Sequence, residues 1–270
     1  MIISELKKDA KIKLTGSYVK ALLIYLLYFV IIFLTTFLGI YIKNDLIYSI
    51  YQIIVLIFTV PFSFGVVASI MKITRNDDVG VIDFIKIGLK NIKGVWKTVG
   101  RTFLKLIIPI ILLTASFVFL FALFMQNFVD LSNSTIRTVT ISELLTPNFI
   151  IAFILVIVAT IYAIYKSLSY SLSYYILFDN PELDGKEIVE KSKKLMRNNK
   201  LNLVLLTLSF VIWYMVIYLI GTFLSYILGS ISVIITAFLS ILLVPYVTGA
   251  TICFYEELLS SSENNNNNNK

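Results

Sequence analysis

The chain has 270 residues, of which 58% are hydrophobic and only 14% are charged, and its formal net charge is +7. Soluble domains hold about 45–50% hydrophobic and about 25% charged residues, so this chain lacks the polar residues that a soluble surface needs. The single cysteine, Cys253, has no disulfide partner, and the chain has no histidine, the commonest metal ligand and general base. Composition therefore predicts an all-α, polytopic membrane protein and excludes a disulfide-stabilised extracellular scaffold.

Six apolar segments are long enough to be transmembrane helices, because a bilayer core needs about 20 apolar residues per helix. They cover residues 19–42, 46–73, 103–124, 149–170, 203–228 and 230–255. The runs are too long and too continuous for the alternating strands of a β-barrel. We expect one six-span membrane domain over residues 1–259, followed by a disordered Asn-rich tail at 260–270.

Lysine and arginine residues are distributed unevenly between the two sides that these spans define. Residues 7–20 hold five of them, residues 72–105 hold eight, residues 166–200 hold seven, and Lys270 ends the chain. The other side has only Lys43 and Arg137. Because cytoplasmic segments are enriched in Lys and Arg, both termini are predicted to be cytoplasmic. The basic charge is a topology signal, and no soluble basic domain exists that would bind nucleic acid.

Three Lys-rich segments precede spans one, three and five, and they share a spacing around Gly16, Gly94 and Asn198. The shared positions are an acid eleven residues earlier, a small residue six earlier and an apolar residue two earlier: Glu5, Ala10 and Leu14; Asp83, Gly88 and Ile92; Glu187, Ser192 and Met196. Each segment is predicted to be a short amphipathic helix that stops at the Gly or Asn, before a membrane hairpin. A threefold repeat explains this spacing, and so does the general pattern of Lys-rich amphipathic helices.

The middle segment has the clearest amphipathic pattern. Ile85, Leu89, Ile92, Trp96 and Val99 follow the 3–4 spacing of one helical face. Cations run beside that face and are candidate contacts for anionic lipid headgroups: Lys86, Lys90, Lys93, Lys97 and Arg101. A docking site for a protein partner in the membrane is the alternative.

Two further features lie around the fourth span. Lys166 is the one charge in the apolar run 149–178, where it either snorkels to the headgroups or lines a substrate path. The third amphipathic helix is expected to begin after Asn180 as its cap, with Pro181 and Glu182 in its first turn.

The sequence offers little catalytic chemistry. No acidic residue lies inside a predicted span, and no Walker A loop, HExxH or GxSxG motif is present. We therefore expect no enzyme activity, no cofactor and no metal.

A recognisable pattern in the second half comprises Tyr170, Ser171, Tyr175, Ile176, Leu177, Asp179, Asn180, Pro181, Ser192, Leu195, Met196, Lys200, Leu208, Ser209, Phe210, Trp213, Pro245, Tyr246, Phe254, Tyr255 and Glu256. Near the N-terminus the pattern includes Glu5, Leu6, Lys7, Ala10, Lys11, Leu14 and Gly16. With these residues the chain resembles a bacterial integral-membrane family, domain of unknown function 975, although Asn198 and Asn199 stand where the family more often has Gly and His. The resemblance implies a multi-span protein of a bacterial cell membrane and supplies no activity, substrate or catalytic residue.

Two functions are compatible with these observations. The first is a non-enzymatic membrane protein that organises, assists or regulates other proteins or lipids, with anionic headgroups as partners. The alternative is a component of a transporter or exporter for a lipid, a peptide or another amphiphile.

Overall fold

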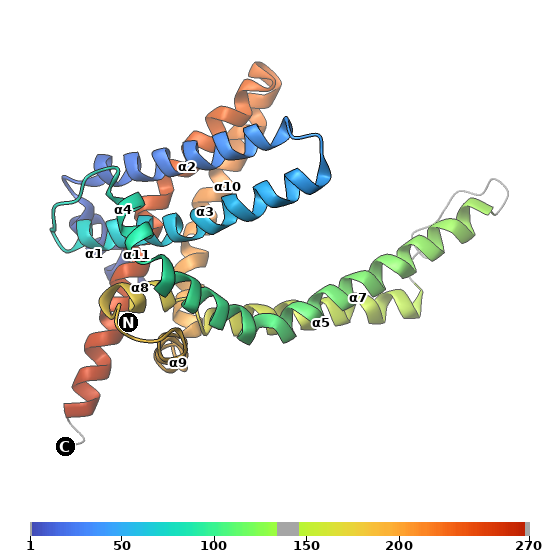
Figure 1. The fold of residues 1–270 in the computed structure, drawn as a ribbon. Coiled ribbons are helices and arrows are strands. Elements are labelled where there is room, and N and C mark those ends of the chain that lie inside the picture. The colour runs from blue at the N-terminus through green and yellow to red at the C-terminus, as the bar shows by residue number, and fades with distance from the viewer. Residues whose placement is uncertain (1, 134–145, 268–270) are drawn as a thin grey trace.

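The computed structural model describes residues 2–133 and 146–267, and within these residues the chain is helical without strands (Figure 1). The long helices form three hairpins: α2 (Tyr18–Ile40) with α3 (Asp45–Thr74), α5 (Ile92–Asn133) with α7 (Pro147–Leu168), and α10 (Lys200–Leu228) with α11 (Ile231–Asn267). The short helices are α1 (Ile3–Leu14), α4 (Asp83–Lys90), α8 (Ser173–Asp179) and α9 (Gly185–Leu195). The all-α fold class predicted from the sequence is confirmed.

Six helical stretches are long and apolar enough to cross a membrane. They are Tyr18–Ile40, Asp45–Thr74, Ile92–Gln126, Pro147–Asp179, Lys200–Leu228 and Ile231–Ser262. Each predicted span falls on one of them, so the chain is a multi-pass membrane protein. The third is longer than predicted, because the basic segment before residue 103 continues directly into α5.

Polar caps start the helices that return through the membrane. The side chain of Asn44 accepts a hydrogen bond from the backbone N–H of Ile47 at 3.1 Å and starts α3. The hydroxyl of Thr146 accepts one from Phe149 at 3.3 Å and starts α7. Lys43 lies beside Asn44 in the turn between α2 and α3, whereas Arg137 lies outside the described residues.

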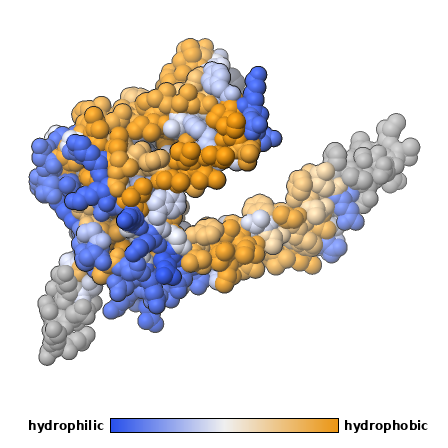
Figure 2. Space-filling model, in the orientation of Figure 1, coloured by the Kyte–Doolittle hydropathy of each residue, from blue (hydrophilic) through white to orange (hydrophobic). Residues whose placement is uncertain are grey.

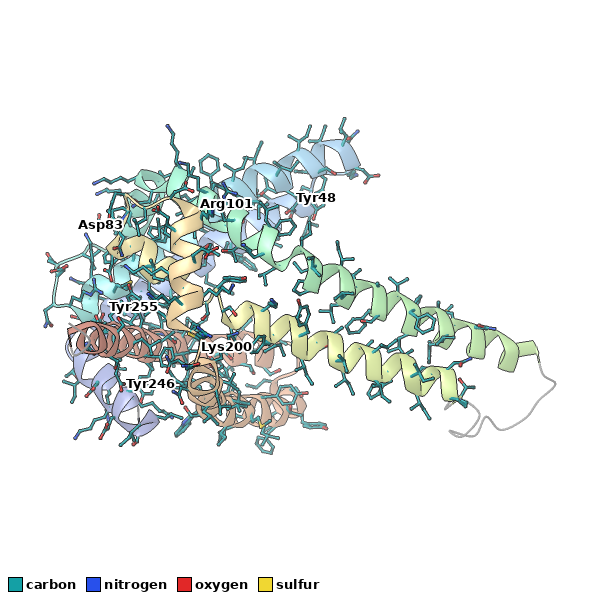
Figure 3. The ribbon with its side chains drawn as sticks, turned by 90° about the horizontal axis from the view of Figure 1, so that it is seen from below. Tyr48, Asp83, Arg101, Lys200, Tyr246 and Tyr255 are labelled. Atoms are coloured by element: carbon teal, nitrogen blue, oxygen red, sulfur yellow. The ribbon has the colours of Figure 1, made fainter. Side chains whose placement is uncertain are left out.

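The three hairpins diverge from one end of the molecule, and the α5–α7 hairpin stands apart from the other two (Figures 1 and 3). Its most apolar windows are only 6% and 11% buried, against 39% for Asp45–Thr74. The middle hairpin therefore contacts the rest of the chain mainly at its base, and α3 is the most enclosed span.

The short helices gather at the end from which the hairpins diverge, and we call this region the polar end: α1, α4, α8, α9 and the adjoining ends of the long helices (Figure 1). Hydrophilic residues cover it, while hydrophobic residues cover the hairpins (Figure 2). This segregation of charge from apolar surface is the pattern of a helix bundle whose arms lie in lipid.

Three short helices each pack against a hairpin other than the one that they precede in the chain. A Cβ on Gly249 of α11 would lie 2.8 Å from Leu14 of α1. A Cβ on Gly88 of α4 would lie 2.5 Å from the carbonyl oxygen of Pro61 in α3. The hydroxyl of Ser192 in α9 donates to the carbonyl of Ser169, just after α7, at 3.1 Å. Each short helix thus joins its own hairpin to the preceding one, and α1 joins the first to the last.

The core of the polar end is built from residues at equal spacing after Gly65, Ser169 and Gly249. The residues three positions after these are fully buried: Ala68, Leu172 and Ile252. The residues six positions after them are also buried: Met71, Tyr175 and Tyr255. The rings of Tyr175 and Tyr255 stack with centroids 5.6 Å apart. A threefold repeat stays a prediction, and this equal spacing is the packing that such a repeat would require.

The predicted register of the middle Lys-rich segment is wrong by about one helical turn. Gly94 lies inside α5, and α4 instead ends at Lys90, with Asn91 as its C-terminal cap. Gly65 of α3 packs against Phe84 and Gly88 of α4. In the same way, Gly249 of α11 packs against Ala10 and Leu14 of α1. The residue that corresponds to Ala10 is therefore Phe84 and not Gly88. Apolar residues recur every three or four positions in all such helices, so spacing alone does not separate registers one turn apart.

The other two predicted helix stops lie in turns. Gly16 follows α1 with a φ of +84°, a left-handed conformation that Gly adopts without steric cost. Asn198 lies in the turn between α9 and α10.

The predicted start of the third short helix is also wrong. Asn180 follows the last residue of α8, and α9 begins at Gly185 with Asp184 as its cap. Asp184 and Glu187 form a reciprocal capping box, which satisfies two backbone N–H groups and makes Asp184 the better cap.

At the other end of the chain, α11 reaches Asn267. The described part of the Asn-rich segment is therefore helical, where the sequence predicts disorder, and residues 268–270 lie outside the described residues. No Gly or Pro follows Pro245 and Gly249 to stop the helix before residue 267.

Candidate functional site

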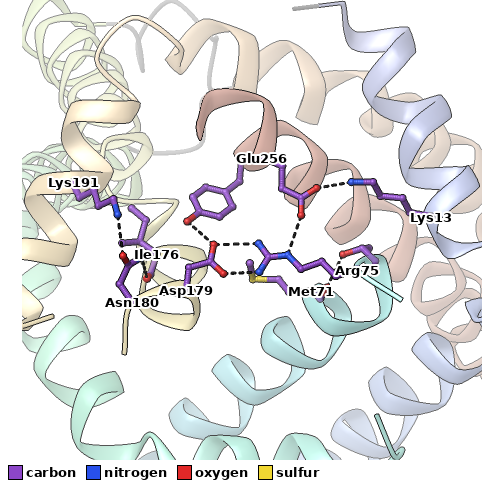
Figure 4. A network of polar contacts seen from close by, with 10 residues as sticks. Lys13, Met71, Arg75, Ile176, Asp179, Asn180, Lys191 and Glu256 are labelled. Carbon is purple, nitrogen blue, oxygen red and sulfur yellow. Dashed lines mark hydrogen bonds and ion pairs between the residues drawn. The ribbon is translucent and has the colours of Figure 1, made fainter. Parts of the chain in front are cut away.

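A chain of ion pairs crosses the polar end and joins four elements (Figure 4). Arg75, just after α3, donates two hydrogen bonds to the carboxylate of Asp179 at the end of α8, at 2.6 and 3.1 Å. Its Nε donates to Glu256 of α11 at 3.1 Å, and Lys13 of α1 donates to the same carboxylate at 2.5 Å. The hydroxyl of Tyr255 donates to Asp179 at 3.0 Å. We call these five residues the polar junction.

The polar junction is balanced in charge and partly shielded from solvent. The side chains of Arg75, Asp179 and Glu256 are 32%, 21% and 24% exposed, between the values of a surface pair and a buried pair. The guanidinium group also lies 5.7 Å from the ring centroid of Phe178. A planar fork that bridges two carboxylates fixes both distance and orientation, which a lysine would not do.

The ion pairs of the polar junction stabilise the protonated forms of Arg75 and Lys13. Hydrogen bonding to Asp179 raises the pKa of Arg75, against the opposing effect of burial. Burial lowers the pKa of Lys13, but its hydrogen bond with Glu256 and the attraction of nearby negative groups together outweigh that effect and leave the pKa above its ordinary value. A raised cation pKa stabilises the fold below the ordinary pKa, and this stability is lost only as the pH rises through the higher value. The junction is therefore expected to persist at neutral pH.

The ion pairs of the polar junction connect four helices. Both carboxylates are bound by cations from other helices, so their negative charges join α1, α3, α8 and α11. Among the described residues, no group of three or more His, Cys, Asp or Glu side chains could hold a metal ion.

The five predicted headgroup cations are exposed but belong to two helices. Lys86 and Lys90 lie in α4, whereas Lys93, Lys97 and Arg101 lie in the first turns of α5. Lys86 pairs with Asp83 at 3.1 Å, and Lys97 pairs with Asp184 at 3.6 Å.

The predicted apolar face of this segment is also displaced, since the fully buried residues are Phe84, Gly88, Val95 and Thr98. The prediction that Ile85, Leu89, Ile92, Trp96 and Val99 share one helical face is therefore wrong, because α4 ends at Lys90 and a new helix, α5, begins at Ile92.

Lys166 lies in the last turn of α7, near the polar end, with its Nζ 5.5 Å from the ring centroid of Tyr162. It lines a pocket of about 500 Å³ together with Lys193, Lys194, Arg197, Lys200 and Glu190. Figure 3 shows Lys200 near the base of the α5–α7 hairpin. The sequence shows the basic run 193–200, but its meeting with Lys166 depends on how α9 and α10 fold back on α7.

The amino-acid sequence alone does not predict that the five residues of the polar junction lie in contact. Asp179, Tyr255 and Glu256 are among the residues that carry the family resemblance, whereas Arg75 and Lys13 appear only as topology cations. No local spacing connects residues 13, 75, 179 and 256, which come from four separate elements.

Comparison with known sequences places the chain in one family. Residues 1–262 match a family described as Protein of unknown function (DUF975). Neither the search of curated proteins nor the search of solved structures gives a match. The match extends over all three hairpins and every member of the polar junction, and the chain belongs to the DUF975 family of proteins of unknown function.

Proposed function

We propose that this protein is a non-enzymatic, multi-pass protein of the bacterial cell membrane that organises, assists or regulates other membrane components. Its polar end and both termini face the cytoplasm, where anionic lipid headgroups and a membrane protein are its partners. The observation that carries the proposal is the gathering of exposed cations and four short helices at one end of an apolar helix bundle.

Charge distribution supports the orientation and the lipid partner. In the sequence, 21 of the 23 Lys and Arg residues fall in segments predicted to face the cytoplasm, and cytoplasmic leaflets carry negative surface charge. The cations Lys90, Lys93 and Arg101 are exposed beside the base of the third span, at the level where headgroups would lie.

The side chains of the polar junction support a role without catalysis. A catalytic carboxylate needs access to a substrate and a tuned proton affinity, whereas Asp179 and Glu256 each contact a cation that joins two helices.

A transporter component for an amphiphile is the second candidate, because the separate α5–α7 hairpin has an apolar groove of about 500 Å³ on its own surface.

The proposal is tested by purifying the protein in mild detergent and identifying the lipids and proteins that remain bound. Anionic lipids are expected to be enriched over the whole-membrane composition. Combined Lys90→Gln, Lys93→Gln and Arg101→Gln changes should reduce this enrichment several-fold, because each cation near the surface attracts anionic lipid by about 1 kcal/mol. Lys43→Gln, at the opposite end of the molecule, is the control and should leave the enrichment unchanged.

Repeated absence of enriched anionic lipid and of any bound protein would contradict the proposal. The same protein in vesicles separates the two candidates. Movement of a lipid or peptide across those vesicles, above the protein-free rate, would favour the transporter.

A further inference from the structure

A pocket at the base of the α5–α7 hairpin is lined by an unusual excess of cations. Lys166 reaches it from the last turn of α7, Lys193 and Lys194 from the last turn of α9, Arg197 from the following turn, and Lys200 from the first turn of α10. Glu190 is the carboxylate among the described lining residues. The pocket has a volume of about 500 Å³ and an open mouth, so it can admit a group from the surrounding lipid or solvent.

The charges in this pocket are poorly neutralised by the protein itself. The carboxylate of Glu190 lies 3.9 Å from Lys105 of α5, so part of its charge is directed away from the pocket cations. The Nζ of Lys200 lies 3.2 Å from the ring centroid of Tyr165. The ring carries no net charge, so the positive charge of the ammonium group is not neutralised. By contrast, the predicted headgroup cations Lys86 and Lys97 both pair with carboxylates.

The walls of the pocket are fixed relative to one another. The buried hydroxyl of Ser192 in α9 donates to the carbonyl of Ser169 at the end of α7, at 3.1 Å. Ser169 itself lines the pocket and is only 3% exposed. This hydrogen bond therefore joins two of the segments that carry the pocket cations, α9 and the end of α7.

We propose that this pocket binds the phosphate-bearing headgroup of an anionic phospholipid. Four lysines and one arginine match a phosphodiester, because ammonium groups supply point charges and a guanidinium can donate two parallel hydrogen bonds to phosphate oxygens. The proposal rests on the proposed function for its membrane orientation and adds a single, saturable site.

The position of the pocket in the fold identifies a lipid as the source of the phosphate. Lys166 lies in the last turn of α7 and Lys200 begins α10, so the cations lie where these two helices meet the polar end. The ring of Tyr165, which is 54% exposed, extends the lining toward the apolar part of α7. A tyrosine at this level is typical of the interface between headgroups and acyl chains.

Binding of short-chain phospholipids to the purified full-length protein tests the site. The probes are dioctanoyl phosphatidylglycerol, dioctanoyl phosphatidylcholine and inorganic phosphate, each titrated in detergent and followed by native mass spectrometry. The wild type is expected to bind one phosphatidylglycerol and to retain it better than phosphatidylcholine. Combined Lys194→Gln and Arg197→Gln changes should weaken phosphatidylglycerol binding about tenfold to thirtyfold.

The matched control is the combination Lys8→Gln and Lys11→Gln, which removes two exposed cations from α1 at the same end. It should change binding by less than about twofold. Equal loss in both variants would overturn the pocket but leave general attraction to anionic lipid intact. Equal affinity for inorganic phosphate would overturn the lipid assignment in favour of a soluble anion.

Failure of the wild type to bind phosphatidylglycerol would also overturn the pocket. The co-purification test then decides separately whether the proposed function stands. Size-exclusion chromatography and circular dichroism check that each variant is folded, and the exposed pair Lys193→Gln with Lys194→Gln provides a second pocket variant.

Discussion

At the scale of single residues, Arg75 has the most distinctive environment. Its guanidinium group lies between the carboxylates of Asp179 and Glu256, which belong to helices far apart in sequence. Without this cation the ion pairs that join the end of α3 to Asp179 and Glu256 would be lost, while Lys13 would still pair with Glu256. The free energy of unfolding should therefore depend more on Arg75 than on an exposed charge.

Replacement of Arg75 by Gln is expected to lower the free energy of unfolding by about 1–3 kcal/mol. This range lies between the effect of breaking an exposed ion pair and that of removing one partner from a buried pair. Arg75→Lys keeps the charge but loses the two-pronged geometry, so its effect should be intermediate. The measurement is the apparent Tm of the purified protein in detergent.

Lys86→Gln is the control for this series, because Lys86 is 78% exposed and pairs with Asp83 only three residues away. Such a pair contributes less than about 0.5 kcal/mol. Equal shifts in the apparent Tm for Arg75→Gln and Lys86→Gln would show that the polar junction does not stabilise the fold.

At the scale of elements, the close approach of α4 to α3 depends on two glycines. Gly65 packs against the backbone of Phe84, and Gly88 packs against the backbone of Pro61. The obstacle in both cases is the main chain, which cannot rotate aside as a long side chain can. The interface therefore tolerates no Cβ at these positions without a shift of one helix.

Gly65→Ala is expected to destabilise the protein by about 1–3 kcal/mol, because added volume in a tight contact forces the backbone apart. Gly100→Ala is the matched control in α5, where a new Cβ would meet nothing within 4 Å. There the gain in helix propensity should dominate, with an effect near zero or up to about 1 kcal/mol of stabilisation. The measurement is the apparent Tm of the Gly65→Ala and Gly100→Ala variants in the same detergent. Equal destabilisation of the two variants would contradict the close packing of α4 on α3.

At the scale of the whole molecule, three hairpins are tied together at one end and diverge toward the other. Lys43 lies at the far tip of the α2–α3 hairpin, and Lys186 lies in the first turn of α9 at the polar end. If the hairpins cross the membrane, these two residues must face opposite compartments. The distribution of Lys and Arg assigns the side of Lys186 to the cytoplasm.

Labelling of single cysteines with a membrane-impermeant thiol reagent tests this orientation, in a Cys253→Ser background. Lys43→Cys should react in intact cells, whereas Lys186→Cys should react only after the cells are permeabilised. Both side chains are exposed, so a difference in reactivity reports the compartment rather than burial. Reaction of both residues in intact cells would contradict the hairpin arrangement, and a reversed pattern would invert the orientation.

Local sequence patterns predict some segments of this structure and leave others undecided. The six spans and the stop at Gly16 follow from apolar length and from the backbone freedom of glycine, both of which are local properties. The cap at Asp184 was open to the same reasoning, because Asp184 with Glu187 is a capping-box spacing. Asn180 and Pro181 form an equally plausible start in sequence, and only the position of α8 decides between them.

The sequence by itself determined the class of this protein, because long apolar runs and scarce charge leave helices in a membrane as the stable arrangement. It also predicted that cations gather on one side, since this depends only on their number between spans. The tertiary structure alone decided which of those cations meet a carboxylate and which line an open pocket. Arg75 with Asp179, and Lys166 with Lys200, are joined by helix packing across long stretches of chain, which no local spacing encodes.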